Sequence, residues 1–176
     1  MTDPESGPEF VVLLAEDGTP IGTADKSVVH GADTPLHLAF SCHIVGGDGR
    51  FLLTRRALGK QAFPGVWTNA VCGHPAPGEP MEDAVRRRAR FELRLDLGAL
   101  ELVLPDFRYR AADASGTVEN EICPVFLARV VVDPSPDPSE VVEWAWVAPD
   151  KLREAVRATP FAFSPWLVGQ LEGWPA

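Results

Sequence analysis

The order of apolar and polar residues along the chain predicts strands over most of its length. The apolar run FVVLLA from Phe10 is followed by the turn signal EDGTP and then by IGT, which predicts an opening hairpin. Residues 36–45 and 51–54 are also apolar and flank GGDGR, whose glycines suit a tight turn, so a second hairpin is predicted there. Further strands are expected at residues 100–104, 107–111, 117–132 with an interruption at Pro124, and 141–147.

Helical periodicity is clearest between Pro80 and Leu93. Proline suits the first turn of a helix, Glu82 and Asp83 favour the positive end of the helix dipole, and the apolar residues keep a helical spacing. Two shorter helices are expected near the end of the chain, at residues 151–158 and 165–172.

Residues 55–79 are rich in proline and glycine and lack a helical period, so we expect mostly loop there. A loop of this length in a compact domain is usually functional. The 176 residues contain no internal repeat and no interdomain linker. We therefore expect a single domain over residues 1–176, of the α/β class in its α+β form, with a mixed β-sheet sandwiched between helices and residues 1–8 as a flexible N-terminal tail.

Charge is unevenly distributed along the chain. The net charge is −9, yet residues 50–110 hold 11 of the 16 basic residues against 7 acidic ones. An acidic protein with a basic centre suits a small anionic ligand better than a nucleic acid, which needs a broad basic surface. A solvated helix face would explain the same charges equally well.

Neither a membrane span nor a targeting signal is visible in the sequence. No stretch approaches the ~18 uncharged apolar residues of a span, and MTDPESGPEF has no basic and apolar leader pattern. Cys42, Cys72 and Cys123 cannot all pair with one another, which favours free thiols in a reducing compartment. We expect a cytoplasmic monomer with no nucleic-acid or membrane partner.

Histidines and a close pair of glutamates are candidates for a metal site. Imidazole is the commonest metal ligand, and carboxylates complete sites that favour Mn, Mg or Zn. Glu119 and Glu121 are two residues apart on a predicted strand, so their carboxylates point to the same face. On that face they either bind a cation or are exposed to solvent. Each histidine taken singly could be a hydrogen-bonded loop residue. The histidines are His30, His37, His43 and His74.

The three thiols are not equivalent. Cys72 lies in the long loop beside His74 and could act as a nucleophile or a proton donor. Cys42 lies in an apolar strand and is expected to be packed in the core. Cys123 shares a strand face with the two glutamates, so it stays a candidate as well.

A spaced pattern after the loop resembles the Nudix box, in which a loop, helix and loop present glutamates to a divalent ion bound to a diphosphate. Gly73 and Glu79 are followed by RRARFE at residues 87–92, at the spacing of that box. Arg88 and Phe91, however, stand where two of the family's glutamates belong.

Two further positions bear on this pattern. Arg94 replaces a glycine of the box, and Glu92 alone remains of the usual metal-binding set. Diphosphate hydrolysis needs several carboxylates to hold Mg²⁺ and activate water. Most of the carboxylates that this reaction requires are therefore missing here. Arg88 and Glu92 share one helix face. They could form a surface ion pair, or Arg88 could bind a phosphate group while Glu92 binds the Mg²⁺ that accompanies it.

Longer motifs make the resemblance specific. The chain contains HLAF at His37, TRRALGKQAFPGVWTNAVCGHP at Thr54, PDFRYRA at Pro105, ENEICPVF at Glu119 and TPFAFSPW at Thr159. In this order they resemble the type I isopentenyl-diphosphate delta-isomerases, which have the Nudix fold, and the likeness runs from about residue 10 to 171. The resemblance implies interconversion of isopentenyl and dimethylallyl diphosphates in isoprenoid biosynthesis, with a small isoprenoid diphosphate as the partner.

The resemblance also implies two metal ions and a set of cations around the diphosphate. One ion, Mn²⁺, Mg²⁺ or Zn²⁺, would be held by His30, His37, His74, Glu119 and Glu121. The second, Mg²⁺, would accompany the diphosphate and be held by Glu92. The diphosphate itself would be bound by Lys26, Arg56, Lys60 and Arg88. His43 has no role by resemblance and is left to packing.

Four residues would carry the chemistry by resemblance. Cys72 and Glu121 would be the two acid/base groups that add a proton to one end of the allyl unit and remove another across it. Tyr109 would hydrogen-bond near the glutamate, and the face of Trp166 would stabilise a carbocation. Packing alone favours the interpretation of Trp166 as a core aromatic in a C-terminal helix.

Two other functions compete with isomerisation. A Nudix hydrolase acting on a nucleoside or isoprenoid diphosphate is disfavoured by Arg88 and Phe91 at glutamate positions. A catalytically dead binding module would not need the thiol, the glutamate pair and three histidines together.

Overall fold

A computed structural model describes residues 9–175, so the tail expected at residues 1–8 lies outside the described residues. The strands are β1 (Phe10–Leu14), β2 (Pro20–Asp25), β3 (His37–Leu38), β4 (Phe40–Val45), β5 (Phe51–Arg56), β6 (Trp67–Thr68), β7 (Val71–Gly73), β8 (Leu100–Leu104), β9 (Arg108–Ala112), β10 (Val118–Ile122), β11 (Val125–Arg129) and β12 (Val141–Val147). The helices are α1 (Lys26–Val29), α2 (Met81–Leu93), α3 (Pro149–Ala158), the 3₁₀ turn η1 (Pro160–Ala162) and α4 (Pro165–Glu172). The fold is of the α+β class, as predicted.

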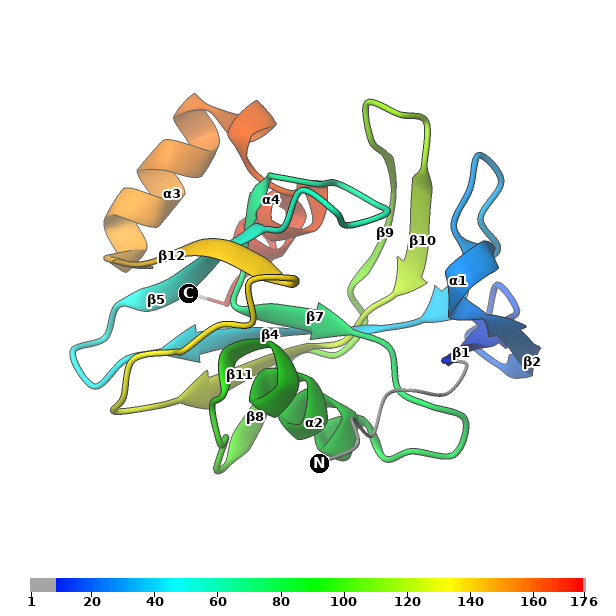
Figure 1. The fold of residues 1–176 in the computed structure, drawn as a ribbon, viewed down its shortest axis with the longest axis horizontal. Helices are drawn as coiled ribbons and strands as arrows, with labels where there is room; N and C mark the ends of the chain where they lie inside the picture. Colours follow the sequence, from blue (N-terminus) through cyan, green and yellow to red (C-terminus); the bar gives the residue numbers. More distant parts are fainter. Residues whose placement is uncertain (1–8, 176) are drawn as a thin grey trace.

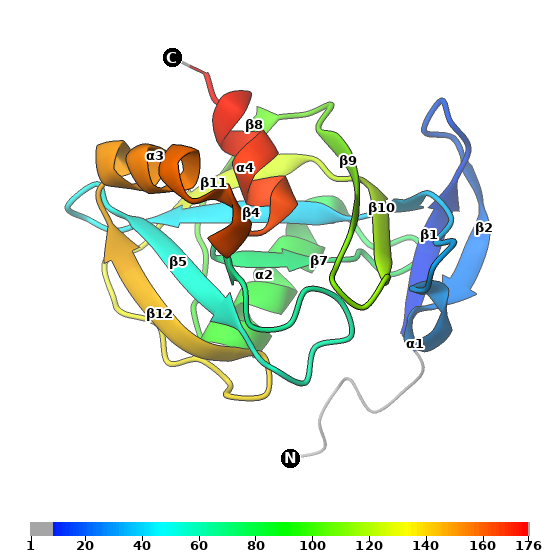
Figure 2. The same cartoon turned by 90° about the horizontal axis from the view of Figure 1, so that it is seen from above.

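The strands form two sheets that lie side by side (Figure 2). The smaller sheet has the order β2-β1-β3-β10-β9, and the larger has the order β12-β5-β4-β11-β8, with β6 added to β5 and β7 to β4. Each sheet contains one parallel pair, β3 with β10 and β4 with β11, and its other pairs are antiparallel. Both sheets are therefore mixed, although a single sheet was expected.

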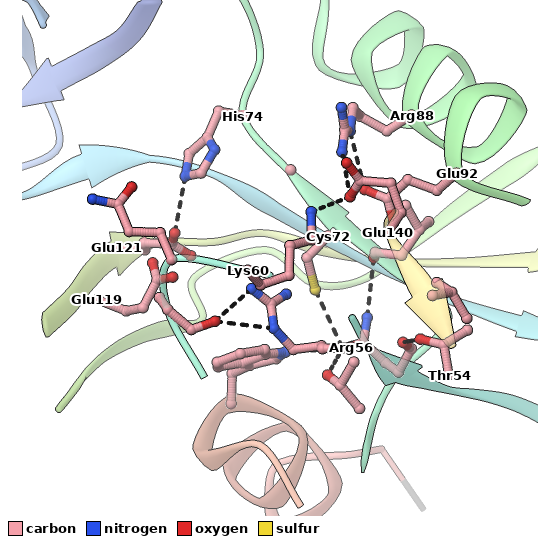
Figure 3. Close-up of a pocket in the computed structure, with 18 of the residues that line it drawn as sticks. Thr54, Arg56, Lys60, Cys72, His74, Arg88, Glu92, Glu119, Glu121 and Glu140 are labelled. Atoms are coloured by element: carbon pink, nitrogen blue, oxygen red, sulfur yellow. Dashed lines mark hydrogen bonds and ion pairs between the residues drawn. The ribbon is translucent and has the colours of Figure 1, made fainter. Parts of the chain in front are cut away.

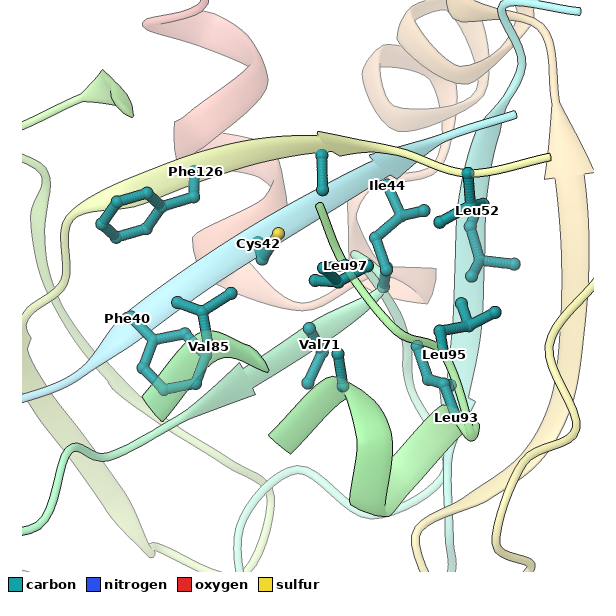
Figure 4. Packing of buried hydrophobic residues seen from close by; sticks show 14 of the residues in the cluster. Phe40, Cys42, Ile44, Leu52, Val71, Val85, Leu93, Leu95, Leu97 and Phe126 are labelled. Atoms are coloured by element: carbon teal, nitrogen blue, oxygen red, sulfur yellow. The ribbon is translucent and has the colours of Figure 1, made fainter. Parts of the chain in front are cut away.

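Helices cover both faces of the larger sheet, with α2 on one side and α3 and α4 on the other (Figure 1). All six residues of β4 are buried, because this strand is covered on both faces. On the α2 side, Phe40, Ile44 and Leu52 pack with apolar residues of the helix and of the segment after it (Figure 4). On the opposite side a second cluster joins Leu53 and Leu167 to α3.

Several predicted elements match the structure closely. The two hairpins are present, and the second turns through Gly46–Arg50 with backbone hydrogen bonds that close it. The predicted helix from residue 80 is α2, which Pro80 precedes. It ends at Arg94 with φ +56°, in the left-handed conformation that favours glycine. The arginine that replaces the family's glycine therefore holds a glycine-like backbone.

The structure differs from the predicted strands at three points. The strand expected at residues 117–132 is interrupted at Pro124, as predicted, but its two halves, β10 and β11, belong to different sheets. Pro124 cannot donate a ladder hydrogen bond, and the chain crosses between the sheets there. The strand expected at residues 36–45 is likewise divided at Ala39. Residues 55–79 are mostly loop, as expected, but they also contain the short strands β6 and β7, which pair with β5 and β4.

The one-turn helix α1 was not predicted. Its first turn is capped by Asp25, whose side chain accepts a 2.8 Å hydrogen bond from the backbone N–H of Ser27. None of the helices within residues 9–175 is both long and apolar enough to cross a membrane.

Candidate active site

A pocket opens beside the junction of the two sheets and gathers nearly all the predicted site residues (Figure 3). Thirteen residues were predicted, and twelve of them line the pocket: Lys26, His30, Arg56, Lys60, Cys72, His74, Arg88, Glu92, Tyr109, Glu119, Glu121 and Trp166. The thirteenth, His37, is fully buried and contacts two of these residues from behind. In the view of Figure 3, Cys72 lies between Glu121 on one side and Arg88, Glu92 and Glu140 on the other.

The histidines and glutamates form one compact cluster. One ligand atom from each of five residues lies within 4.8 Å of all the others, the residues being His30, His37, His74, Glu119 and Glu121. The backbone builds this arrangement because His37 on β3 is the register partner of Glu121 on the parallel strand β10. His74 Nε2 lies 3.2 Å from His37 Nε2 and 3.0 Å from Glu121 Oε1. The two glutamates share a face, as expected.

The chemistry of this cluster fits a bound cation. His37 Nδ1 lies 2.9 Å from the Pro35 carbonyl and donates its proton there, which leaves the Nε2 lone pair facing the cluster. His30 Nε2 and Glu119 Oε2 are 3.4 Å apart, and within residues 9–175 neither buried atom has a hydrogen-bond partner. Buried polar atoms without partners are rare, and a divalent ion would satisfy both.

Burial and mutual repulsion act on the charges of the cluster. Burial, together with the negative charge of Glu121, raises the pKa of Glu119. Burial and the neighbouring imidazole of His37 hold the pKa of His74 well below its usual value, so this ring is neutral and able to bind a metal. The cluster thus combines imidazoles with carboxylates, the ligands that Mn²⁺, Mg²⁺ or Zn²⁺ accept.

Cys72 is the thiol that the pocket exposes. Its Sγ lies 3.2 Å from Ser41 Oγ and donates a hydrogen bond of 3.3 Å to Asn69 Oδ1. Burial raises the pKa of Cys72 to about 12, so the thiol is protonated near neutral pH. Cys123 is 1% exposed and does not line this pocket, while Cys42 is packed in the apolar core, as expected.

Glycine is required next to this thiol. A Cβ at Gly73 would lie 2.9 Å from the Cγ of Arg88 and 3.0 Å from the ring of Phe40. Only a residue without a side chain lets α2 pack this closely against β7. The close approach brings Arg88 to the edge of the pocket beside Cys72.

Tyr109 and Trp166 form an aromatic wall near Glu121. Tyr109 donates a 2.8 Å hydrogen bond to Glu121 Oε2, and its ring centroid lies 5.6 Å from that of Trp166. Burial opposes ionisation of Glu121, but the neighbouring imidazole of His37 and the hydrogen bond from Tyr109 hold the pKa of Glu121 below its ordinary value. Trp166, at the start of α4, is 3% exposed and donates its indole N–H to Asn69 Oδ1 at 3.0 Å.

The predicted diphosphate-binding cations already have partners in the protein. The guanidinium of Arg56 donates to the carbonyl of Ala62 at 2.8 Å and lies 5.5 Å from the centroid of the Trp166 ring. Lys60 forms an ion pair with Glu140. Lys26, which also lines the pocket, forms an ion pair with Glu9.

Arg88 and Glu92 form a buried ion pair, not a surface one. Arg88 is 4% exposed and Glu92 7%, and Arg88 Nε donates to Glu92 Oε1 at 3.1 Å. A second nitrogen of Arg88 lies 3.4 Å from Glu140 Oε2. Glu140 thus contacts two of the predicted cations, and sequence reasoning missed it because nothing in the local pattern before β12 distinguishes this glutamate.

A layer of buried polar side chains beneath the thiol was also missed. Ser41, Asn69 and Gln170 are all fully buried and hydrogen-bonded to one another or to Cys72. The available signal was a polar residue inside an apolar run, as Ser41 is in LHLAFSCHIV and Gln170 in WLVGQL. His43 is packed in the interior, as expected, and also belongs to this layer through Gln170.

Comparisons with known proteins identify a matching family and relatives of high sequence identity. The NUDIX domain family matches residues 35–167. The isopentenyl-diphosphate Delta-isomerase of Agromyces mediolanus is 65% identical over 98% of this chain and 84% of its own length. The protein of the same name from Leifsonia xyli is 61% identical over 97% of this chain and 92% of its own.

Solved structures show the same fold at lower identity. DR0079 from Deinococcus radiodurans superposes with a TM-score of 0.74 at 21% identity, over 96% of this chain and all of the other. The MutT protein from Methanosarcina mazei superposes with a TM-score of 0.64 at 20% identity, over 79% of this chain and 92% of the other.

Proposed function

The chain belongs to the isopentenyl-diphosphate Delta-isomerases of the NUDIX fold, and from this premise we propose that Cys72 and Glu121 move the protons of its reaction. The enzyme interconverts isopentenyl and dimethylallyl diphosphates by shifting a carbon–carbon double bond. The observation that carries the assignment is that a protonated thiol and a carboxylate with a tyrosine hydrogen bond line one pocket.

The shift needs two acid/base groups. One group gives a proton to one end of the allyl unit, and the other takes a proton from the opposite end, so the substrate gains and loses one proton. Cys72 and Glu121 exchange these tasks when the reaction runs in reverse. Tyr109 orients the carboxylate of Glu121 through its 2.8 Å hydrogen bond.

Protonation of an unactivated alkene builds a tertiary carbocation that water would trap. The faces of Trp166 and Tyr109 stabilise such a cation through the ring quadrupole. Trp166 packs edge-on against Phe63, and Tyr109 stacks on Phe107, so these rings form an apolar wall. Water is excluded from the reacting carbons by the same packing.

The five-residue cluster at His30, His37, His74, Glu119 and Glu121 would hold one divalent ion, Mn²⁺, Mg²⁺ or Zn²⁺. When bound, such an ion supplies positive charge beside Glu121 and so tunes the basicity of its carboxylate. The protein's own part is to present the imidazoles and to fix His37 through the Pro35 carbonyl.

The other end of the pocket suits the diphosphate. Lys26, Arg56, Lys60 and Arg88 line it and supply the positive charge that phosphate oxygens need. Glu92 would hold the Mg²⁺ that accompanies the diphosphate. Glu140 offsets part of this positive charge, since it already contacts Lys60 and Arg88.

We further propose that the enzyme works as a cytoplasmic monomer on a small isoprenoid diphosphate, without a nucleic-acid or membrane partner. The three free cysteines suit a reducing compartment. Sedimentation of the purified protein over a range of concentrations tests the monomer, and a mass above 19.1 kDa that persists on dilution contradicts it.

Incubation with isopentenyl diphosphate in deuterated water tests the assignment. We expect dimethylallyl diphosphate carrying deuterium, detected by NMR or mass spectrometry. Released phosphate without label transfer would instead indicate a hydrolase. Glu121→Gln should stop label transfer while the far-ultraviolet circular dichroism spectrum stays unchanged, and an active Glu121→Gln enzyme would remove this residue from the proton transfer.

A further inference from the structure

A chain of buried hydrogen bonds runs from His43 to the sulfur of Cys72. His43 Nε2 lies 2.8 Å from Gln170 Oε1, Gln170 Nε2 lies 2.8 Å from Ser41 Oγ, and Ser41 Oγ lies 3.2 Å from Cys72 Sγ. His43, Gln170 and Ser41 are all fully buried. Buried polar groups cost stability unless they are hydrogen-bonded, so each of these side chains is held in place by its partner in the chain.

The donors and acceptors of this chain can be placed in order. Gln170 uses its amide oxygen to accept the N–H of His43, and therefore its amide nitrogen donates to Ser41. Ser41 accepts that bond, so its own O–H is left to donate to a sulfur. The nearer sulfur is that of Cys72 at 3.2 Å, and that of Cys123 is at 3.5 Å.

The other side of the sulfur is fixed independently. Asn69 donates both N–H groups of its amide, to the carbonyls of Cys42 and Val71, each at 3.1 Å. Its oxygen must therefore face Cys72, and it accepts the thiol proton at 3.3 Å. The sulfur of Cys72 is thus held between one donor, Ser41, and one acceptor, Asn69.

We propose that Ser41, Gln170 and His43 are positioning residues for proton transfer, which aim the Ser41 hydroxyl at the Cys72 sulfur to stabilise the negative charge that develops there. This inference rests on the proposed role of Cys72 and deepens it. A preorganised donor in a buried site stabilises developing charge without reorganising during the reaction. Gln170 sets the direction of the Ser41 hydroxyl, and His43 sets the direction of the Gln170 amide.

The test compares Gln170→Met with the wild-type enzyme. Methionine keeps the volume of the side chain but removes both hydrogen bonds, so the Ser41 hydroxyl can turn away from the sulfur. We expect kcat to fall about 10- to 100-fold, somewhat less than the loss of a full oxyanion-hole donor, while KM stays within about twofold. Ser41→Ala removes the hydroxyl itself and should give the same split, which keeps the test open if Gln170→Met does not fold.

Cys42→Ala is the matched control. Cys42 follows Ser41 on β4 and is also fully buried, but its side chain packs in the apolar core under α2. The variant should lose stability and keep kcat. If Cys42→Ala lowers kcat as much as Gln170→Met does, the effect is general loosening of β4 and the proposal is overturned.

A spectroscopic measurement separates this inference from the catalytic role of the thiol. The S–H stretching band of Cys72 is obtained by subtracting the infrared spectrum of Cys72→Ala from that of the parent protein, in the wild-type and Gln170→Met backgrounds. The band should shift between the two backgrounds, because the sulfur loses the Ser41 donor. An unshifted band overturns the proposal whatever happens to kcat, and so does a shifted band with unchanged kcat. An active Cys72→Ala enzyme would instead contradict the proposed function.

Discussion

The pH dependence of stability should report directly on His43. This imidazole is fully buried, its Nε2 is bonded to Gln170, and its ring packs against Phe51 and Trp174. None of these three neighbours is charged. Burial lowers the pKa of His43 to about 4, whereas an unfolded chain holds a histidine pKa of ~6.5.

The direction and size of the effect follow from this difference. Above pH ~6.5 neither state binds the proton, so His43 contributes a constant stability. As the pH falls below ~6.5, the unfolded chain takes up a proton that the folded protein excludes until the pH nears 4, and stability is lost across that window. At ~1.4 kcal/mol per pH unit, the complete loss is about 3 kcal/mol, of which about 2 kcal/mol is reached by pH 5.

Urea unfolding at a series of pH values, at constant ionic strength and with chelator present, measures this loss. His43→Gln removes the titrating ring and keeps a polar end near Gln170, so its free energy of unfolding should fall by about 2 kcal/mol less than that of the wild type between pH 7.5 and 5. The other titrating groups are common to both proteins and cancel in the comparison. Parallel curves for the two proteins would refute the reasoning.

Four further predictions concern the pocket and the end of α2. Cys72→Ala should lower kcat at least ~100-fold while Cys123→Ala stays within a few-fold, and the reverse order in a turnover assay would transfer the chemistry to the buried thiol. Exhaustive chelation should abolish turnover, with recovery on adding Mg²⁺ together with Mn²⁺ or Zn²⁺; full activity of the metal-free protein would contradict the five-ligand site. Glu140→Gln should tighten calorimetric binding of inorganic pyrophosphate without metal about tenfold, because a carboxylate near two pocket cations is removed. Glu143→Gln, at an exposed position of the strand β12 that follows Glu140, should leave this binding unchanged. Arg94→Gly should raise the free energy of unfolding by about 1 kcal/mol through its left-handed backbone, and an equal gain from Arg94→Ala would show that conformation is not the cause.

Local patterns in the sequence predicted local structure well. The hairpins and α2 depend on neighbouring residues, such as the glycines of GGDGR and the residues after Pro80, so their signals are complete within a few positions. The crossing at Pro124 and the strands β6 and β7 depend on partners far along the chain. No local pattern contains that information.

In the site, too, features with a local sequence signal were predicted, and contacts between distant residues were not. The residues taken from the family's motifs fall around one pocket, and the shared face of Glu119 and Glu121 followed from strand geometry alone. Gln170 could not be placed beside Ser41 from the sequence, because 129 positions separate them. The pairing of Glu140 with Lys60 was hidden for the same reason.

The two parallel pairs, β3 with β10 and β4 with β11, have a consequence for how the protein folds. They join residues near position 40 to residues near position 124, and parallel pairing between distant segments is slow because the intervening loop must close first. The cluster of His37 and Glu121 cannot exist before that closure. A metal ion added during refolding should therefore leave the rate of folding almost unchanged and slow unfolding instead, since it binds only the structure that forms last.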